Sequence, residues 1–395
     1  MPPLPPQPAD VPWPTDEWPT GPVPDGVDLE PLLDEVMDPQ GALVRSRAAL
    51  VVHRGRLIAE RYGDRTDVWG QVTGDPVDES TPLISWSMAK SMLHAVVGML
   101  VDESRLDLDA PAAVPEWTGD DPRAAITLRD LLEMRDGLSF LEDYDPDAGG
   151  SHVIDMLFGD GASDTGGFTA ERPLAHEPGT VFNYSSGTTN VISRIVRDVL
   201  GGEEAYRTFL RERLFGPIGM TSADPRFDDA GTWIASSYVW ATGRDMARFG
   251  HLYLRDGMWN GIRILPEGWV DNARDAHSRD PEDGRLYGGH WWVTGDEHGT
   301  FWASGYEGQS ISVCPSLDLV FVRLGKSTKE QYPALFDWRR RMVDAFAQGL
   351  STWPSGPMQP AGGVVASGPP AGHWPKVFDV VPGWSPPSPG SSPGS

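Results

Sequence analysis

Cysteine is nearly absent from this chain, because only Cys314 occurs among its 395 residues. That single residue excludes an intrachain disulfide and any cysteine-rich metal site. No uninterrupted apolar run reaches the length of a membrane-spanning helix, so the pattern excludes a transmembrane protein. Basic residues are also scarce, with 32 Lys and Arg against 57 Asp and Glu, a formal net charge of −25. Such a charge repels nucleic acid phosphates and anionic lipid surfaces, so we expect neither nucleic acid nor a membrane as a partner.

Hydrophobic periodicity is missing from both ends of the chain. Residues 1–25 carry a dense run of prolines, and residues 351–395 are rich in Pro, Gly and Ser. We therefore predict a disordered or loosely draped extended tail at each end and a folded body over about residues 26–350. The N-terminus also lacks the basic start and apolar stretch of a secretory signal, and together with the single cysteine this favours a cytoplasmic protein.

Short β-type runs occur near both ends of the body. Two of them flank Arg54-Gly55 and predict a hairpin over residues 47–53 and 56–61. Turn sequences separate four later runs, which therefore predict antiparallel strands. Both sets are expected to join one sheet. The later runs cover residues 287–293, 300–304, 309–314 and 319–324.

Helices are expected between the two sets of strands, because capping residues and glycines mark readable ends there. The sequence predicts an α+β fold in which an antiparallel sheet is flanked by helices. Residues 26–84 and 240–350 would form its α/β subdomain, and residues 85–239 a mostly helical subdomain. The expected helices cover residues 87–101, 127–137, 186–201, 203–216 and 242–257.

One of these helices carries a serine and a lysine at the spacing Ser87-x-x-Lys90, among apolar residues that continue almost all the way round the helical wheel. Only four lysines occur in the chain, since arginine is its usual cation. Arginine cannot give up its proton, whereas a buried lysine can become neutral and act as a base. The pattern indicates a nucleophile and its base. The alternative is a surface lysine beside a serine that only caps the helix.

Two further segments could contribute polar groups or backbone to the same candidate site. Tyr184 and Ser186 stand just ahead of a predicted helix, where they either cap it or present a phenol and a hydroxyl to a cleft. Residues 301–309 form a strand that ends in glycines, which allow close approach of the backbone to a ligand.

Taken together, Ser87-x-x-Lys90, Tyr184-x-Ser186 and the strand ending Ala303-Ser304-Gly305 resemble the serine β-lactamase and penicillin-binding-protein superfamily. The class C-type branch is the most similar part of it, and within that branch the 6-aminohexanoate-dimer hydrolases and related esterases. The resemblance implies a β-lactamase-like fold and a cofactor-free serine hydrolase. It extends over nearly all of 26–350, including residues 127–134, 178–187, 238–242 and 260–269.

The resemblance also implies roles for individual residues. Ser87 would be the nucleophile, Lys90 its general base and Tyr184 the proton shuttle to the leaving group. The backbone N–H groups of Ser87 and Tyr306, next to Gly305, would form the oxyanion hole. Ser186 would hold the Lys90 and Tyr184 side chains. Residues expected to line the substrate pocket are Tyr144, Trp292, Ala303 and Ser304.

One position departs from the β-lactamase pattern. Members that act on penicillins usually carry Lys or His where Ala303 stands, so the cation that would hold a substrate carboxylate is missing. We therefore expect short esters or linear amides as substrates. A β-lactamase, a D-aminopeptidase and a sensor that is acylated without turnover stay open as alternatives, and so does a homodimer.

Other chemistries have weaker support in the sequence. The run Gly325-Lys-Ser-Thr328 resembles the end of a P-loop, but Val320 stands where its first glycine is required. His94 lies two helical turns beyond Ser87, about 10 Å along the axis, too far for a hydrogen bond. The histidines show no metal-ligand spacing, so we expect no metal. The sequence also lacks the G-x-S-x-G motif of the α/β-hydrolases, which argues against that fold.

Overall fold

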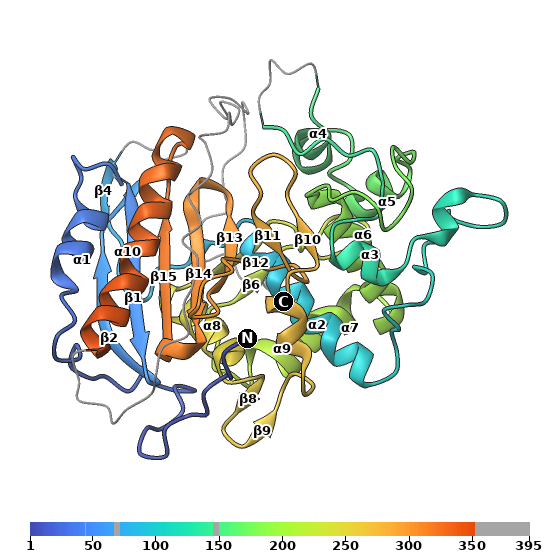
Figure 1. Cartoon of the computed structure of the whole chain (residues 1–395). Helices are drawn as coiled ribbons and strands as arrows, with labels where there is room; N and C mark the ends of the chain where they lie inside the picture. The colour runs from blue at the N-terminus through green and yellow to red at the C-terminus, as the bar shows by residue number, and fades with distance from the viewer. Residues whose placement is uncertain (44, 67–71, 145–149, 352–395) are drawn as a thin grey trace, which may run out of the picture.

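The computed structural model describes residues 1–43, 45–66, 72–144 and 150–351 of the chain (Figure 1). Its largest sheet has eight antiparallel strands in the order β10-β11-β12-β13-β14-β15-β1-β2. β1 lies beside β15, with Leu50 opposite Val322. The strands from the two ends of the body therefore join in one sheet, as the sequence predicts. Its strands are β1 (Ser46–His53), β2 (Arg56–Tyr62), β10 (Ser278–Arg279), β11 (Leu286–Tyr287), β12 (Trp292–Val293), β13 (Phe301–Gly305), β14 (Gln309–Cys314) and β15 (Leu319–Gly325).

The prediction of one strand over residues 287–293 is wrong. The segment forms two short strands, β11 and β12, that pair with each other as a hairpin. Two successive glycines, Gly288 and Gly289, and a left-handed His290 with φ of 58° make the turn between them. The apolar residues on both sides of the turn concealed it, because a hairpin and a continuous strand share the same composition.

A three-stranded sheet joins the two ends of the helical region. β5 (Leu83–Ile84) pairs with β7 (Val239–Ala241), which also pairs with β6 (Asp224–Pro225). The segment 85–239 therefore leaves and re-enters the body on adjacent strands. Its treatment as a separate subdomain stays a prediction. Two further two-stranded sheets are formed by β3 (Asp64–Thr66) with β4 (Val72–Pro76) and by β8 (Met258–Trp259) with β9 (Ile262–Arg263).

Helices cover both faces of the large sheet (Figure 1). α1 and α10 pack on one face, around Phe321 and Trp338. α8 and α2 pack on the other face, where the main hydrophobic core lies. The helices are α1 (Glu30–Met37), α2 (Met88–Asp102), α3 (Leu128–Leu132), α4 (His152–Phe158), α5 (Thr165–Ala170), α6 (Ser186–Leu200), α7 (Glu203–Phe209), which continues as a π-helix over Leu210–Phe215, α8 (Gly243–Leu254), α9 (Trp269–Arg274) and α10 (Tyr332–Ser351).

α2 is the helix around which the rest of the fold is arranged. Every residue from Met88 to Leu100 is buried. It packs against β13 and β14 on one side and against α6 on the other. A polar side chain on this helix therefore has no access to bulk water, and its neighbours determine its protonation state.

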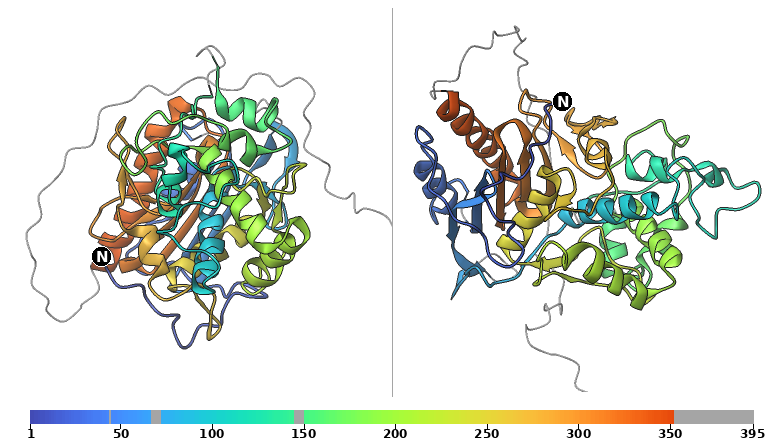
Figure 2. Two further views of the ribbon diagram at one scale, coloured as in Figure 1. Left: turned by 90° about the vertical axis from the view of Figure 1, so that its right-hand side faces the viewer. Right: turned by 90° about the horizontal axis from the view of Figure 1, so that it is seen from below.

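Of the two expectations for residues 1–25, a disordered tail or a loosely draped extended segment, the structure has the extended segment laid on the body. This segment follows the surface of the body, as the dark-blue trace shows in both views (Figure 2). Val11 and Trp18 are buried, and the Trp18 indole Nε1 donates to the Arg244 carbonyl at 3.1 Å. We call residues 1–21 the N-terminal strap. Its order comes from its contacts with α8 and α9, which its own composition does not reveal.

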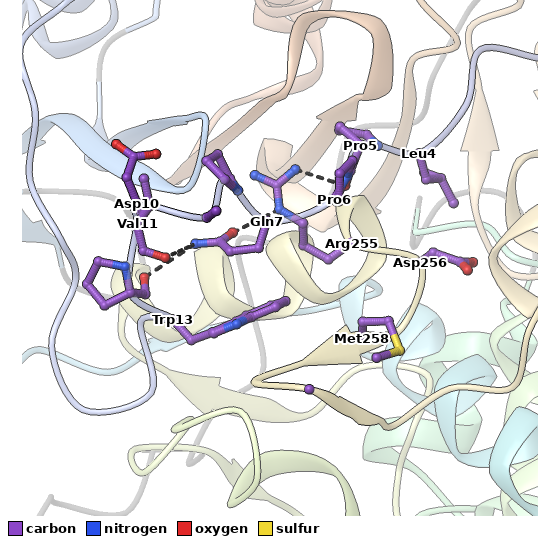
Figure 3. A pocket seen from close by; sticks show the side chains of 14 residues that line it. Leu4, Pro5, Pro6, Gln7, Asp10, Val11, Trp13, Arg255, Asp256 and Met258 are labelled. Atoms are coloured by element: carbon purple, nitrogen blue, oxygen red, sulfur yellow. Dashed lines mark hydrogen bonds between the residues drawn. The ribbon is translucent and has the colours of Figure 1, made fainter.

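Gln7 is the best-connected side chain of the strap (Figure 3). Its Oε1 accepts from Arg255 Nε at 3.0 Å and is 2.9 Å from His251 Nε2, while its Nε2 donates to the Val11 carbonyl at 3.2 Å. Arg255 also donates to the Pro5 carbonyl at 3.1 Å. A surface hollow lies between the strap and the residues Arg255, Asp256 and Met258.

The C-terminal tail predicted over 351–395 lies outside the described residues beyond Ser351. Within the described part of the chain, no helix is both long and apolar enough to cross a membrane.

Candidate active site

The amino end of α2 places Ser87 and Lys90 together. Ser87 stands at the N-cap, yet its side chain makes no capping hydrogen bond. Its Oγ instead accepts a hydrogen bond from Lys90 Nζ at 3.0 Å. Lys90 is only 1% exposed. Ser87 is therefore not a capping serine, and Lys90 is not a surface lysine, so the alternative interpretation of this pair is wrong.

The surroundings of Lys90 favour its neutral form. Nζ donates to three uncharged oxygens: Ser87 Oγ, Ser186 Oγ at 3.0 Å and the Ser236 carbonyl at 3.1 Å. Burial lowers the pKa of Lys90 to about 8, against the opposing charge of Glu142. An amine with such a pKa is partly deprotonated near neutral pH and can accept a proton from a hydroxyl.

Glu142 is a member of this cluster that the sequence did not identify. Its Oε1 accepts from Ser186 Oγ at 2.6 Å, and its Oε2 accepts from the Ser186 backbone N–H at 2.7 Å. Lys90 is thus connected to a carboxylate through one hydroxyl. Among 57 acidic residues a single glutamate carries no signal of its own, and only its place two residues before Tyr144 could have drawn attention to it.

Ser186 is free to make these contacts because its neighbour caps the helix. The Ser185 Oγ accepts from the Thr188 N–H at 2.9 Å and so caps α6. Ser186, the first residue of the helix, then directs its hydroxyl to Lys90 and Glu142. The Tyr-Ser-Ser sequence therefore both caps the helix and supplies the cluster, two outcomes that the sequence left as alternatives.

Tyr184 lies against the same group of side chains. Ser87 acts on its hydroxyl and lowers its pKa, against the larger effect of burial, and Lys90 Nζ lies 4.9 Å from the centroid of its ring. The ring stacks on Trp292, with centroids 5.5 Å apart and planes 28° apart. Burial raises the pKa of Tyr184, so the phenol keeps its proton at neutral pH and is available as a proton donor.

The end of β13 approaches the start of α2 closely at Gly305. A Cβ on Gly305 would lie 2.3 Å from the Ser85 carbonyl oxygen, so only glycine allows this approach. The ring of Tyr306, the next residue, meets the edge of the Trp86 ring at 5.6 Å. Among the described residues, no backbone acceptor takes a hydrogen bond from the Ser87 N–H. The Ser87 N–H is therefore a donor at the start of α2 without a backbone partner among the described residues.

The four residues expected to line the pocket differ in their positions. Tyr144 stacks on Tyr306 at 4.8 Å and donates to Glu142 Oε1 at 3.1 Å, so it belongs to the cluster. Trp292 is buried against Tyr184. Ala303 is buried in the main core that contains α2, and Ser304 is partly exposed at the next position of β13.

The other chemistries considered from the sequence have structural explanations. His94 lies between the Tyr253 hydroxyl at 2.8 Å and Asn272 Oδ1 at 3.0 Å. Lys326, in the run that resembles a P-loop, pairs with Glu307 at 2.6 Å. Over the described residues, no group of three or more His, Cys, Asp and Glu side chains is arranged to hold a metal ion.

Comparison with known proteins identifies similar sequences. The family model described as Beta-lactamase matches residues 33–346. The chain is 31% identical over 319 residues to the 6-aminohexanoate-dimer hydrolase of Paenarthrobacter ureafaciens, a match that covers 75% of this chain and 74% of that protein.

Solved structures show the same fold. A Bacillus anthracis protein assigned as a 6-aminohexanoate-dimer hydrolase superposes with a TM-score of 0.68 at 25% identity, over 89% of this chain and 91% of that one. A family VIII carboxylesterase superposes with a TM-score of 0.59 over 76% of this chain and 93% of that one, and at 16% identity it shows the fold alone.

Proposed function

The chain belongs to the beta-lactamase family, and from this premise we propose that it is a serine hydrolase that cleaves short esters and linear amides through an acyl-enzyme on Ser87. The observation that carries the proposal is the 3.0 Å hydrogen bond from Lys90 Nζ to Ser87 Oγ, made by a lysine that is fully buried among uncharged acceptors. An amine in this setting can serve as a general base, which activates a serine for attack on a carbonyl carbon.

Acylation begins with proton transfer from Ser87 Oγ to neutral Lys90 as the oxygen bonds to the substrate carbonyl carbon. Negative charge then develops on the carbonyl oxygen. We assign the N–H groups of Ser87 and Tyr306 as the donors that stabilise it, and the close approach of the end of β13 to the start of α2 at Gly305 supports this assignment. Two fixed donors in a buried site stabilise the developing charge without reorganisation of solvent.

Collapse of the tetrahedral intermediate breaks the bond to the leaving group, which then needs a proton. The Tyr184 hydroxyl, which Ser87 influences and which keeps its proton at neutral pH, can deliver that proton. The Lys90 ammonium, 4.9 Å from the Tyr184 ring, then returns the Ser87 proton to the phenolate. Both groups are restored to their starting states, and a water molecule can release the acyl group by the same steps in reverse order.

Ser186 and Glu142 act on this chemistry by positioning. Ser186 Oγ accepts from Lys90 while it donates to Glu142, which fixes the rotamer of the lysine. The carboxylate also raises the pKa of Lys90 against the effect of burial. Glu142 therefore prevents the lysine from becoming too weak a base.

The preference for esters and linear amides over β-lactams rests on position 303. The residue there is a buried alanine, which cannot bind a carboxylate beside the nucleophile. The named activity of the Paenarthrobacter ureafaciens relative, hydrolysis of the 6-aminohexanoate dimer, involves a linear amide. A sensor that is acylated once without turnover is the second candidate, because the same cluster would serve it.

Labelling of the nucleophile tests this proposal. A fluorophosphonate probe should add one mass increment to the peptide that contains Ser87, and Ser87→Ala should abolish both labelling and hydrolysis of 4-nitrophenyl butyrate. Ser91→Ala is the matched control, since that hydroxyl lies one turn further along α2 and donates to the His290 carbonyl. Steady turnover after the first burst distinguishes an enzyme from a sensor. Labelling of another serine in place of Ser87 would contradict the proposal.

A further inference from the structure

The loop between β13 and β14 is left-handed at two successive positions. Its residues are Tyr306, Glu307 and Gly308, and the last two have φ angles of 59° and 83°. Glycine adopts such a conformation freely, whereas a glutamate does so only when its surroundings hold it there. Because the proposed mechanism uses the Tyr306 N–H, the contacts that hold this loop also determine the position of that donor.

Arg323, on β15, reaches this loop because β15 is paired with β14 (Figure 1). Its Nη1 donates to the carbonyls of Glu307 and Gly308, at 3.1 and 3.3 Å. Its Nε donates to Ser46 Oγ at 3.0 Å, and its Nη2 donates to Ser327 Oγ at 2.8 Å. All three nitrogens of the guanidinium are therefore used, and they connect the loop to β1 and to the end of β15.

The surroundings of Arg323 are built for a guanidinium. A Cβ on Gly308 would lie 2.9 Å from Arg323 Nη1, and a Cβ on Gly325 would lie 2.6 Å from Arg323 Cζ, so two glycines make room for it. The side chain is fully buried, and burial lowers its pKa only to about 10, so it stays charged at neutral pH. A charge buried among uncharged acceptors is costly, and an apolar side chain would fill the same place. The position therefore requires the fork of donors and not packing alone.

The run Gly325-Lys-Ser-Thr328, which resembles the end of a P-loop in sequence, contacts the same loop. Lys326 Nζ donates to Glu307 Oε1 at 2.6 Å, and the Ser327 N–H donates to the Glu307 carbonyl at 2.8 Å. The Tyr332 hydroxyl, at the start of α10, accepts from the Glu307 N–H at 3.1 Å. The run therefore has its partner within the chain itself.

The loop borders the candidate active site on its other side. Gly305, directly before the loop, packs against the Ser85 carbonyl, and the Tyr306 ring meets the edge of the Trp86 ring. Ser85 and Trp86 immediately precede Ser87. A shift of the loop would move the Tyr306 N–H relative to the Ser87 N–H, and two donors stabilise an oxyanion together only when each lies about 2.7–3.1 Å from it.

We propose that Arg323, together with the segment 326–327, forms a clamp that positions the Tyr306 N–H in the oxyanion hole. We call residues 323, 326 and 327 the loop clamp. The inference rests on the proposed function, because an oxyanion forms only if Ser87 attacks a carbonyl carbon. Arg323 is the central positioning residue of the clamp, since it bonds to two carbonyls of the loop. It acts on the reaction through the backbone of the loop.

The kinetics of Arg323→Lys test the proposal. The substitution keeps the charge but loses the fork that bonds to both carbonyls. Removal of one oxyanion-hole donor lowers kcat by about 10²–10³, so a misplaced donor should lower it by about tenfold or more, with KM for 4-nitrophenyl butyrate changed by less than about twofold. The pH midpoint of kcat/KM should stay in place, because it depends on Lys90.

A boronic acid provides a readout that a merely structural role would not move. Propylboronic acid matches the acyl chain of the butyrate ester. Ser87 Oγ bonds to its boron, the serine proton passes to Lys90 and no group leaves, so one oxygen of the tetrahedral adduct lies where the oxyanion would form. We expect the inhibition constant to rise in Arg323→Lys by the factor by which kcat/KM falls, since both depend on the same donors.

A second variant tests the same loop from another element, including the case in which Arg323→Lys does not fold. Tyr332→Phe removes the acceptor of the Glu307 N–H, so it should lower kcat and weaken boronate binding in the same proportion. Arg274→Lys is the matched control, because that arginine is also buried but bonds to the strap. It should change the stability and leave kcat and boronate binding unchanged.

The outcomes separate this inference from the proposed function. Unchanged kcat and boronate inhibition in a folded Arg323→Lys, or in Tyr332→Phe if the first does not fold, would overturn the clamp and leave the role of Ser87 intact. A fall in kcat without weaker boronate binding, or with a shifted pH midpoint, would also overturn it, because the effect would then lie outside the oxyanion hole. Hydrolysis that persists in Ser87→Ala would overturn the proposed function, and the clamp with it.

Discussion

Buried cations occur in two regions of this molecule, and their partners differ. Lys90 in the candidate active site donates to two hydroxyls and one carbonyl. At the contact between the N-terminal strap and the body, Arg255 is fully buried and pairs with Asp318 at 2.7 Å, while Arg248 pairs with Asp245 at 2.6 Å. Both arginines also donate to carbonyls of the strap. One region places its cation among uncharged partners, and the other provides acids.

The difference separates a reactive group from a structural one. Burial disfavours the charged form of a lysine that has no direct carboxylate partner. The pKa of Lys90 is therefore lowered to about 8. Arginines that are paired with aspartates stay charged and fix the position of the chain that they bind. Four predictions test this comparison.

The strap should be the largest contributor to stability. Deletion of residues 2–21 removes the carbonyl acceptors of Arg248, Arg255 and Arg274, which receive hydrogen bonds from these buried guanidiniums at 2.6, 3.1 and 2.6 Å. A hydrogen bond to a charged group contributes about 1.5–3 kcal/mol, so we expect a loss of about 5 kcal/mol or more in unfolding free energy, measured in urea. An unchanged denaturation midpoint would mean that the strap is dispensable, as its composition alone suggests.

Lys90→Arg should nearly abolish activity. The substitution keeps a positive charge but removes a group able to lose its proton, so the rate of Ser87 acylation should fall by about 10²–10⁴. Burst amplitude and rate with 4-nitrophenyl butyrate provide the measurement, and a thermal melt shows whether the variant is folded. Near-normal acylation in a folded variant would show that the cation alone suffices.

Gln7→Ala should have a moderate effect on stability. The substitution removes the acceptor of the buried Arg255 Nε and the contact with His251. A buried donor left unsatisfied costs about 1–3 kcal/mol, and we expect a loss in that range, measured by urea denaturation. Gln40→Ala is a control, because Gln40 is an exposed glutamine outside the strap, and it should change the unfolding free energy little.

Glu142→Gln should shift a pH profile. Lys90 acts as a base only when neutral, so kcat/KM should rise with pH and level off above about 8. The charge of Glu142 raises the pKa of Lys90. Its removal should therefore lower that pKa and move the midpoint to lower pH, by about one unit. Asp143→Asn, at the adjacent carboxylate, should leave the midpoint in place, and a shift to higher pH in Glu142→Gln would contradict this assignment of charges.

The parts of the fold that follow from local patterns were predictable. The hairpin around Arg54-Gly55, the strands β13 to β15 and the buried helix α2 all have periodicity and turn residues within a few positions of each other. The break between β11 and β12 was missed because apolar residues continue across its glycines. The contacts of the strap with the body were not predicted. A proline-rich run lacks hydrophobic periodicity in either case, so its sequence does not reveal whether it packs against a distant surface.

The sequence by itself determined that Ser87 meets Lys90, since a spacing of three residues puts both side chains on one face of a helix. It also indicated that Tyr184 and Ser186 would stand at a helix start. Only the tertiary structure decided that Glu142 supports Lys90 through Ser186 and that Asp318 pairs with the buried Arg255. Those contacts join residues far apart in the chain, where no local spacing constrains them, and their strength depends on burial that arises only when the elements pack.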